Sequence, residues 1–303
     1  MAYLRSSKGS PLATCGAALK VLLWGVLALS MVGCEAADRS HSLSLMNQGV
    51  GYYREVNYPK AVDKLKESVE VWPKNDRSNY LLGQIYQFKY DQPDQAHVFY
   101  DKATELVPSN AHYWYSKGAT LAETDRLDEA EQALKKAAEL DGQHADAHYR
   151  LGLLYERKGE AVKAAHAYGA SVTANPRKPF AFYNLGDLYY RNDKLDEARQ
   201  VFKNGVENNP DHAELHHGLG VAYLSLTRHR EALIEFEEAL RLKSSYPSAL
   251  YNIGMAYQAL GEWTKAKTYL EKFISSAAGG DNAARIAAAE ARLLEIREAE
   301  ERR

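Results

Sequence analysis

The stretch NLGDLYYRNDKLDEARQVFKNGVENNP, residues 184–210, decides the fold. Leu185 and Tyr189 lie four residues apart, as do Ala198 and Phe202, and this is the spacing of one face of a helix. A proline closes the stretch, and the residue before a proline is disfavoured in a helix. The stretch therefore predicts two helices in succession, joined by a short turn and followed by a break.

The same marks return along most of the chain, always in the same order. Glycine recurs every 34 residues, with one step of 35, at Gly49, Gly83, Gly118, Gly152, Gly186, Gly220 and Gly254. Alanine keeps this period at Ala61, Ala96, Ala130, Ala164, Ala198, Ala232 and Ala266. A third series runs Tyr52, Tyr86, Leu121, Tyr155, Tyr189, Tyr223 and Tyr257, and a fourth runs Leu65, Tyr100, Leu134, Tyr168, Phe202, Phe236 and Leu270. Four position classes that keep phase over seven copies predict a repeat protein.

This pattern resembles the tetratricopeptide repeat, whose marks are Leu-Gly-x-x-Tyr, then Ala, then Phe, then Pro over 34 residues. The resemblance implies an all-α, right-handed superhelical solenoid of helix-turn-helix units. Its repeats would span 42–75, 76–110, 111–144, 145–178, 179–212, 213–246 and 247–280, with a capping helix at 281–303. Small residues at positions eight and twenty would let paired helices approach, and bulky residues at positions eleven and twenty-four would fill the space beside them.

Two details fit this scheme. The 35-residue step falls in repeat two, where the loop between the helices, around residues 88–94, holds one extra residue. Loops accept such insertions at low cost.

Past repeat seven, Asp281 is a candidate cap for a final helix whose apolar face would be Ile286, Ala289, Leu293 and Ile296. We expect this helix to cover the end of the array with a polar outer face.

The first residues form a separate segment. Residues 1–20 carry three basic residues and no acid, and the apolar run VLLWGVLALSMVG fills residues 21–33. This is the pattern of a secretory signal. The junction from Met31 to Cys34 resembles a bacterial lipobox, which implies removal of residues 1–33 and lipidation of Cys34. A short linker at 34–41 would then join a bilayer anchor to the first repeat; an ordinary signal with an incidental cysteine is the alternative.

Composition excludes several classes of protein. The chain of 303 residues carries 38 Lys+Arg against 40 Asp+Glu, which argues against a nucleic-acid binder. With 2 Cys, no disulfide scaffold is possible, and no catalytic, cofactor or small-molecule motif stands out. The pairs His144/His148 and His212/His216 leave a metal protein or hydrolase as a hypothesis from another class. Their shared repeat positions favour packing instead, so we expect no enzyme, no cofactor and no metal site.

The excess of 21 Tyr over 7 Phe directs attention to one surface. In the family that the chain resembles, position five faces the groove that binds partners, and five of its seven residues here are Tyr. We expect a groove for protein or peptide segments, lined by Tyr80, Tyr115, Tyr149, Tyr183, Asp187, Tyr190, His217 and Tyr251. Tyr suits such a surface, since it offers a large contact area and a hydroxyl. The alternative is that these rings only pack, and that binding uses the convex face or the ends.

These features predict a membrane-anchored scaffold lipoprotein without catalysis of its own. Its general plan resembles the pilotin lipoproteins that help secretin rings of type IV pili assemble. Lipoprotein factors for outer-membrane barrel assembly or polysaccharide export are alternatives of the same class. The residue after Cys34 is Glu35 rather than the Asp that retains some lipoproteins in the inner membrane. The expected location is therefore the outer membrane, facing the periplasm.

Overall fold

The computed structural model describes residues 35–277 and 282–301, and this part of the chain holds helices and no strand. The predicted signal at 1–33, the predicted lipidation site Cys34 and the predicted cap Asp281 lie outside the described residues. The chain divides into two compact units, which meet in sequence between Arg126 and Leu127. Within the described residues, no helix is long and apolar enough to cross a bilayer.

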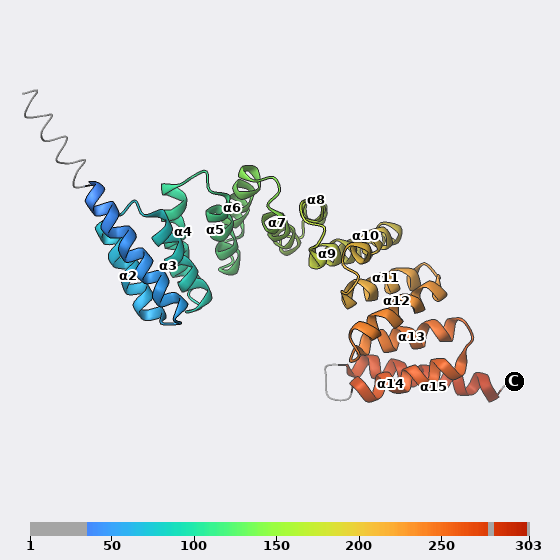
Figure 1. Cartoon of the computed structure of the whole chain (residues 1–303). Helices are drawn as coiled ribbons and strands as arrows, with labels where there is room; N and C mark the ends of the chain where they lie inside the picture. The colour runs from blue at the N-terminus through green and yellow to red at the C-terminus, as the bar shows by residue number, and fades with distance from the viewer. Residues whose placement is uncertain (1–34, 278–281, 302–303) are drawn as a thin grey trace, which may run out of the picture. The chain divides into compact units, whose positions relative to one another are not determined.

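The first unit is a run of antiparallel helices in which neighbours in sequence pack together (Figure 1). Residues 35–54 are helical from the first described residue onward. The predicted linker therefore differs in the structure, because residues 35–41 already belong to this helix. The later helices of the unit are α2 (Tyr58–Val71), α3 (Asp76–Phe88), α4 (Pro93–Leu106) and α5 (Ala111–Glu123).

The second unit continues the same alternation to the end of the described chain (Figure 1). Its helices are α6 (Leu127–Leu140), α7 (Ala145–Arg157), α8 (Ala161–Ala174), α9 (Pro179–Arg191), α10 (Leu195–Asn208), α11 (Ala213–Ser225), α12 (His229–Leu242), α13 (Pro247–Ala259), α14 (Trp263–Ala277) and α15 (Ala283–Glu301). The described helices thus follow the seven predicted pairs, with α15 as the additional last helix. This confirms the expected all-α solenoid architecture.

Within each of the two units, the helices of a pair are held together by a bulky side chain lying against a glycine. A Cβ placed on Gly186 of α9 would come within 2.7 Å of the Phe202 ring of α10, so only glycine fits there. The ring of Tyr100 lies similarly close to Gly83. The alanines of the twentieth position are completely buried in all seven copies. Small residues and large ones therefore interlock at the predicted positions, which brings the paired helices close together.

The tyrosines at position eleven, the third series of the repeat, also contact cations. Most of these tyrosines have a cation from the following turn or helix over the ring; for example, Arg228 lies 4.7 Å from the centroid of Tyr223. Lys265 is placed in the same way 5.0 Å from Tyr257. Cation–π contacts of this kind stabilise the rings where they lie beside the second helix of the pair.

A polar cluster at the start of the first unit ties its first two helix pairs together. Ser42, Ser68, Asn75 and Ser78 are all buried. Ser42 Oγ lies 2.9 Å from Ser68 Oγ, and Asn75 Nδ2 donates to both hydroxyls, at 2.9 and 3.1 Å. Because the buried groups satisfy one another, the cluster fixes the register between the helices without leaving an orphan donor.

The array ends under α15. Ala289 and Ile296 of this helix are fully buried, and Leu293 is nearly so, against a cluster that includes Phe273 of α14. Ile286 packs against the same cluster. The predicted apolar face of the capping helix is therefore the face that is buried.

Candidate partner-binding groove

The first helices of the pairs in the second unit border a hollow of about 330 Å³, which we name the α9–α11 hollow. Apolar side chains and a glycine lie beside polar ones in its lining. Side chains of α9, α10, α11, α13 and α15 contribute: Tyr183, Asp187, Tyr190, Phe202, His217, Gly218, Val221, Leu224, Ser225, Asn252 and Arg285. Four of these residues, Tyr183, Asp187, Tyr190 and His217, belong to the set that the sequence predicts for a partner groove.

The sixth repeat position has a different residue at this hollow than in the neighbouring repeats. Asn184 and Asn252 fill this position in the neighbouring repeats, whereas α11 has Gly218. A Cβ on Gly218 would lie 2.5 Å from the Phe202 ring. The Phe202 ring therefore occupies the place of a side chain at this position and forms part of the lining of the hollow.

The first unit has a comparable feature, a hollow of about 600 Å³ on its own first helices. Its lining comes from the helix 35–54, from α3 and from the start of α5, and includes Met46, Val50, Tyr80 and Tyr113. The predicted residue Tyr80 stands between two rings, 5.7 Å from Tyr100 and 4.8 Å from Tyr113. The same repeat positions therefore border a hollow in each unit.

The position-five rings pack and remain accessible at the same time. Tyr183 lies 6.1 Å from Phe202, and His217 lies 5.6 Å from Phe236, so each ring leans on the bulky residue of its own pair. Each is only half-buried. Each ring therefore packs within the array, and His217 also lies 4.8 Å from the Tyr246 ring. The part that these rings play in partner binding stays a prediction.

Three predicted residues line neither of these two hollows. Tyr149 is half-buried, lies 5.8 Å from Tyr168, and accepts a hydrogen bond of 3.3 Å from Asn184. Tyr251 meets the edge of Phe273 at 5.2 Å. Tyr115 is half-buried on α5. Their assignment to a binding surface stays a prediction.

An ion-pair chain runs from the rim of the α9–α11 hollow toward α7. Arg191 Nε donates to Asp187 at 2.7 Å, and the guanidinium also pairs with Glu156. Glu156 in turn accepts from the Tyr168 hydroxyl at 2.5 Å. Burial, followed by the charge of Asp187, raises the pKa of Tyr183. Tyr183 therefore remains a neutral hydroxyl that can donate or accept a hydrogen bond.

At the other side of the hollow, His217 meets residues that arrive from α13 and α15. Asn252 Nδ2 lies 3.1 Å from His217 Nε2. Burial, and then the charge of Arg285, lowers the pKa of His217 to about 4. The imidazole is therefore neutral at pH 7, and its Nε2 accepts the hydrogen bond from the Asn252 amide.

Sequence reasoning missed four polar or glycine residues of this hollow. Gly218, Ser225, Asn252 and Arg285 all contribute to its lining. The sequence does mark Gly218 as unusual, because the corresponding residue is Asn in both flanking repeats. No repeat pattern pointed to Arg285, since α15 lies outside the periodic part of the chain.

The paired histidines serve the fold. His144 caps α7, with its Nδ1 accepting from the Ala147 amide at 3.2 Å. His216 is buried with Nδ1 2.7 Å from Glu235 and Nε2 3.0 Å from the Pro210 carbonyl. Among the described residues, no group of His, Cys, Asp and Glu is arranged to hold a metal ion.

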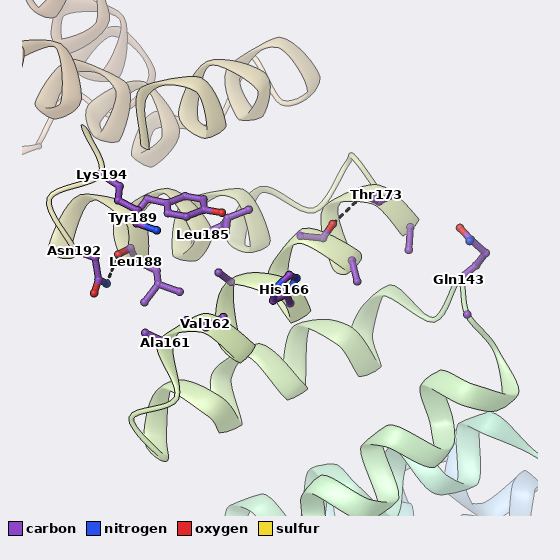
Figure 2. A pocket seen from close by; sticks show the side chains of 15 residues that line it. Gln143, Ala161, Val162, His166, Thr173, Leu185, Leu188, Tyr189, Asn192 and Lys194 are labelled. Carbon is purple, nitrogen blue, oxygen red and sulfur yellow. Dashed lines mark hydrogen bonds between the residues drawn. The ribbon is translucent and has the colours of Figure 1, made fainter. Parts of the chain in front are cut away.

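A wider depression, of about 680 Å³, lies on the second helix of a pair, α8, beside α9. In Figure 2, Val162 and His166 of α8 lie across it from Leu188 and Tyr189 of α9. It is shallow-walled because α8 carries small residues there; Gly169 stands where the other repeats have Lys66, Asp101, Lys135, Lys203, Glu237 and Glu271. None of the predicted groove residues lines this depression.

Comparison with protein families follows the periodic part of the chain. Three family models, each described as a tetratricopeptide repeat, match residues 128–179 with 183–247, residues 111–144 and residues 248–278. Together they cover more than half of the chain. A search of curated proteins found no significant match.

Several solved structures share the fold. MamA is similar at 28% identity over 53% of this chain and 93% of that chain, with a TM-score of 0.51. YrrB, described as a TPR protein with an unusual peptide-binding site, is similar at 23% identity over 61% of this chain and 95% of that chain, with a TM-score of 0.51. Pseudomonas aeruginosa pilF is similar at 20% identity over 75% of this chain and 98% of that chain, with a TM-score of 0.56.

Proposed function

The chain belongs to the tetratricopeptide repeat family, and from that premise we propose that it is a lipid-anchored adaptor of the bacterial envelope that holds a protein partner in its groove. Proteins of this family are protein-interaction scaffolds, generally without catalysis, that bind peptides or proteins in a groove. The protein would therefore act by bringing partners together. Its own residues would supply contact area and hydrogen bonds.

One observation carries the assignment of the binding surface. Side chains that the sequence places at the groove positions line the α9–α11 hollow together, and their rings stay half-buried. An apolar floor with a few polar groups at the rim is the usual make-up of a recognition site. The hollow therefore supports binding at this face rather than at the convex face.

The anchor and the location rest on the sequence of residues 1–34. A basic start, an apolar run and a lipobox-like junction support lipidation of Cys34 and export across the inner membrane. The pilotin role is supported by the same general plan and by the shared fold with pilF, which extends over 75% of this chain. We propose assistance to secretin assembly as the function, with outer-membrane barrel assembly and polysaccharide export as the alternatives.

A charge placed in the hollow tests the groove. Leu224 lines the hollow, so Leu224→Asp should abolish crosslinking of the partner in envelope fractions. The matched control is Ile234→Asp, because Ile234 is an apolar residue that is 65% exposed on α12 and lies outside the hollow. Crosslinking followed by mass spectrometry measures both. Equal partner recovery from Leu224→Asp and Ile234→Asp would exclude the hollow as the binding surface.

Two further measurements test the anchor and the pathway. Cys34→Ser should move the protein from the membrane pellet to the soluble fraction, since the acyl chains are the proposed anchor. In a host with type IV pili, deletion of the gene should reduce the heat-stable secretin multimer, and Leu224→Asp should reproduce that loss. Membrane partitioning of Cys34→Ser at the wild-type level would refute lipid anchoring at this residue.

A further inference from the structure

We propose that the α9–α11 hollow takes an acidic peptide segment, whose carboxylate pairs with Arg285 of the capping helix while an apolar side chain enters the hollow. The proposal rests on the proposed function, because it specifies the partner chemistry of the same site. It also gives α15 a role in recognition besides covering the core.

The charge balance at the hollow favours an anionic ligand. Of the residues that line it, Asp187 and Arg285 carry charge. Asp187 is already neutralised by Arg191 at 2.7 Å. Nearby Lys243 is likewise paired with Glu214 at 3.0 Å. The positive charge that the hollow can offer a ligand is therefore that of Arg285.

Arg285 keeps most of its hydrogen-bond donors available in the structure. Its Nη1 donates to the Ser248 hydroxyl at 3.0 Å, a neutral partner. Within the described part of the chain, no carboxylate lies within ion-pair distance of it. A guanidinium has five N–H donors in a fixed fork, so most of them stay available to a bidentate carboxylate. The Ser248 contact holds the side chain at the rim, which lowers the cost of ordering it on binding.

The rest of the hollow suits a peptide segment in its shape and its chemistry. Its floor of Phe202, Val221 and Leu224 suits an apolar side chain. Asn252 points its amide nitrogen at neutral His217, so its amide oxygen is left to accept from a peptide N–H. On the opposite wall, the Tyr190 hydroxyl lies 3.1 Å from Ser225 Oγ near the open rim. An apolar floor, hydrogen-bonding groups for a peptide backbone and one cation together match an acidic peptide.

The experiment works with a partner that is still unidentified. A library of random fifteen-residue peptides displayed on phage is selected on the full chain in detergent, and in parallel on its Arg285→Gln and Leu224→Asp variants. Peptides selected by the wild type should be enriched in Asp and Glu beside an apolar residue. This enrichment should vanish with Arg285→Gln. The matched control is Arg297→Gln, an exposed arginine of the same helix outside the hollow, which should keep it.

Fluorescence anisotropy with the most enriched peptide gives the magnitude. Arg285→Gln should raise its Kd about tenfold or more, and Arg285→Glu should regain affinity for a copy of the peptide with Lys in place of the acid. Selected peptides that need Leu224 but show no acidic preference would overturn the inference and leave the groove function intact. Failure to select any peptide that depends on Leu224 would overturn both.

Discussion

At the scale of single residues, the turn inside each helix pair requires a backbone conformation that not every residue type adopts easily. One residue per turn has a positive φ, in the order Val56, Asp91, Asp125, Gly159, Asp193, Thr227 and Gly261. Gly, and to a lesser degree Asp, adopts this conformation at low cost, whereas a β-branched residue does so only under strain. Thr227 and Val56 therefore carry strain that the other repeats avoid.

Thr227→Gly should stabilise the protein by about 1 kcal/mol, because glycine removes the steric penalty at a φ of 58°. The midpoint of urea unfolding, followed by circular dichroism, measures the gain. Gly159→Ala is the matched reverse change at a φ of 74° and should destabilise by a similar amount. A loss of stability in Thr227→Gly would show that the threonine is not strained.

His217 should make the stability depend on pH in an acidic window. Its folded pKa of about 4 lies below the unfolded value of 6.5, so the unfolded chain binds the proton more readily between these values. The stabilising contribution of the neutral ring is complete above pH 6.5 and is lost as the pH falls through 4. The difference amounts to roughly 3 kcal/mol at most.

His216 supplies the internal control for this effect. Burial alone would lower the pKa of His216, but its hydrogen bonds to Glu235 and to the Pro210 carbonyl overcome this and raise it. Its contribution is therefore present below pH 6.5 and is lost as the pH rises through the folded pKa. Unfolding midpoints of His217→Gln and His216→Gln across pH 4 to 8 should depart from the wild type at opposite ends. A parallel departure would contradict the assignment.

At the scale of helices, glycine has two opposite roles that the repeat pattern separates. Gly186 stands at a position where a Cβ would strike the Phe202 ring, whereas a Cβ on Gly169 of α8 would meet nothing within 4 Å. Both glycines lie inside helices, where glycine costs roughly 0.5–1 kcal/mol relative to alanine. At Gly186, the close packing that the glycine permits offsets this cost. At Gly169, no packing contact within the chain offsets it.

Alanine substitutions should therefore have opposite signs at these two sites. Gly186→Ala should destabilise by about 1–3 kcal/mol through overpacking against Phe202. Gly169→Ala should stabilise by about 0.5–1 kcal/mol, because only the helix propensity changes. Thermal unfolding of the two variants side by side provides the measurement. Stabilisation by Gly186→Ala would mean that the packing of α9 on α10 is not limited by the glycine.

The pairing of helices was predictable from the sequence, and the reason is locality. Gly186 and Phe202 are sixteen residues apart and recur with the same spacing, so a single repeat already contains the contact. The start of the first helix was not predictable in this way. Residues 35–41 precede the first periodic mark, and nothing repeating in them distinguishes a helix from a linker.

At the scale of the whole molecule, the core is a series of local clusters along the array. One cluster joins the helix 35–54 to α2 and α3, another joins α9 to α10 and α11, and a third joins α12, α13 and α14 to α15. The helices of these clusters thus bury their apolar faces against their neighbours, as in other repeat proteins, and the last pair depends on α15.

Removal of α15 should expose this last cluster. Truncation after Ala277 uncovers Phe273 and deletes the buried Leu293 and Ile296, which should destabilise the C-terminal repeats by at least about 3 kcal/mol. Urea unfolding followed by near-ultraviolet circular dichroism should show an earlier transition. Truncation after residue 298, which keeps the buried face of α15, serves as control. An unchanged midpoint after the longer truncation would show that the cap contributes no stability.

The sequence by itself determined the period, the helix pairs, the glycine and aromatic positions and the buried face of the last helix, because each depends on contacts within one repeat or on one helical face. Tertiary structure decided which side chains border the α9–α11 hollow. Tyr183 and Arg285 are about a hundred residues apart and come from a repeat and from the non-repeating cap. They line one hollow only when α9, α11, α13 and α15 stack, and the Phe202 ring joins that lining because Gly218 has no side chain.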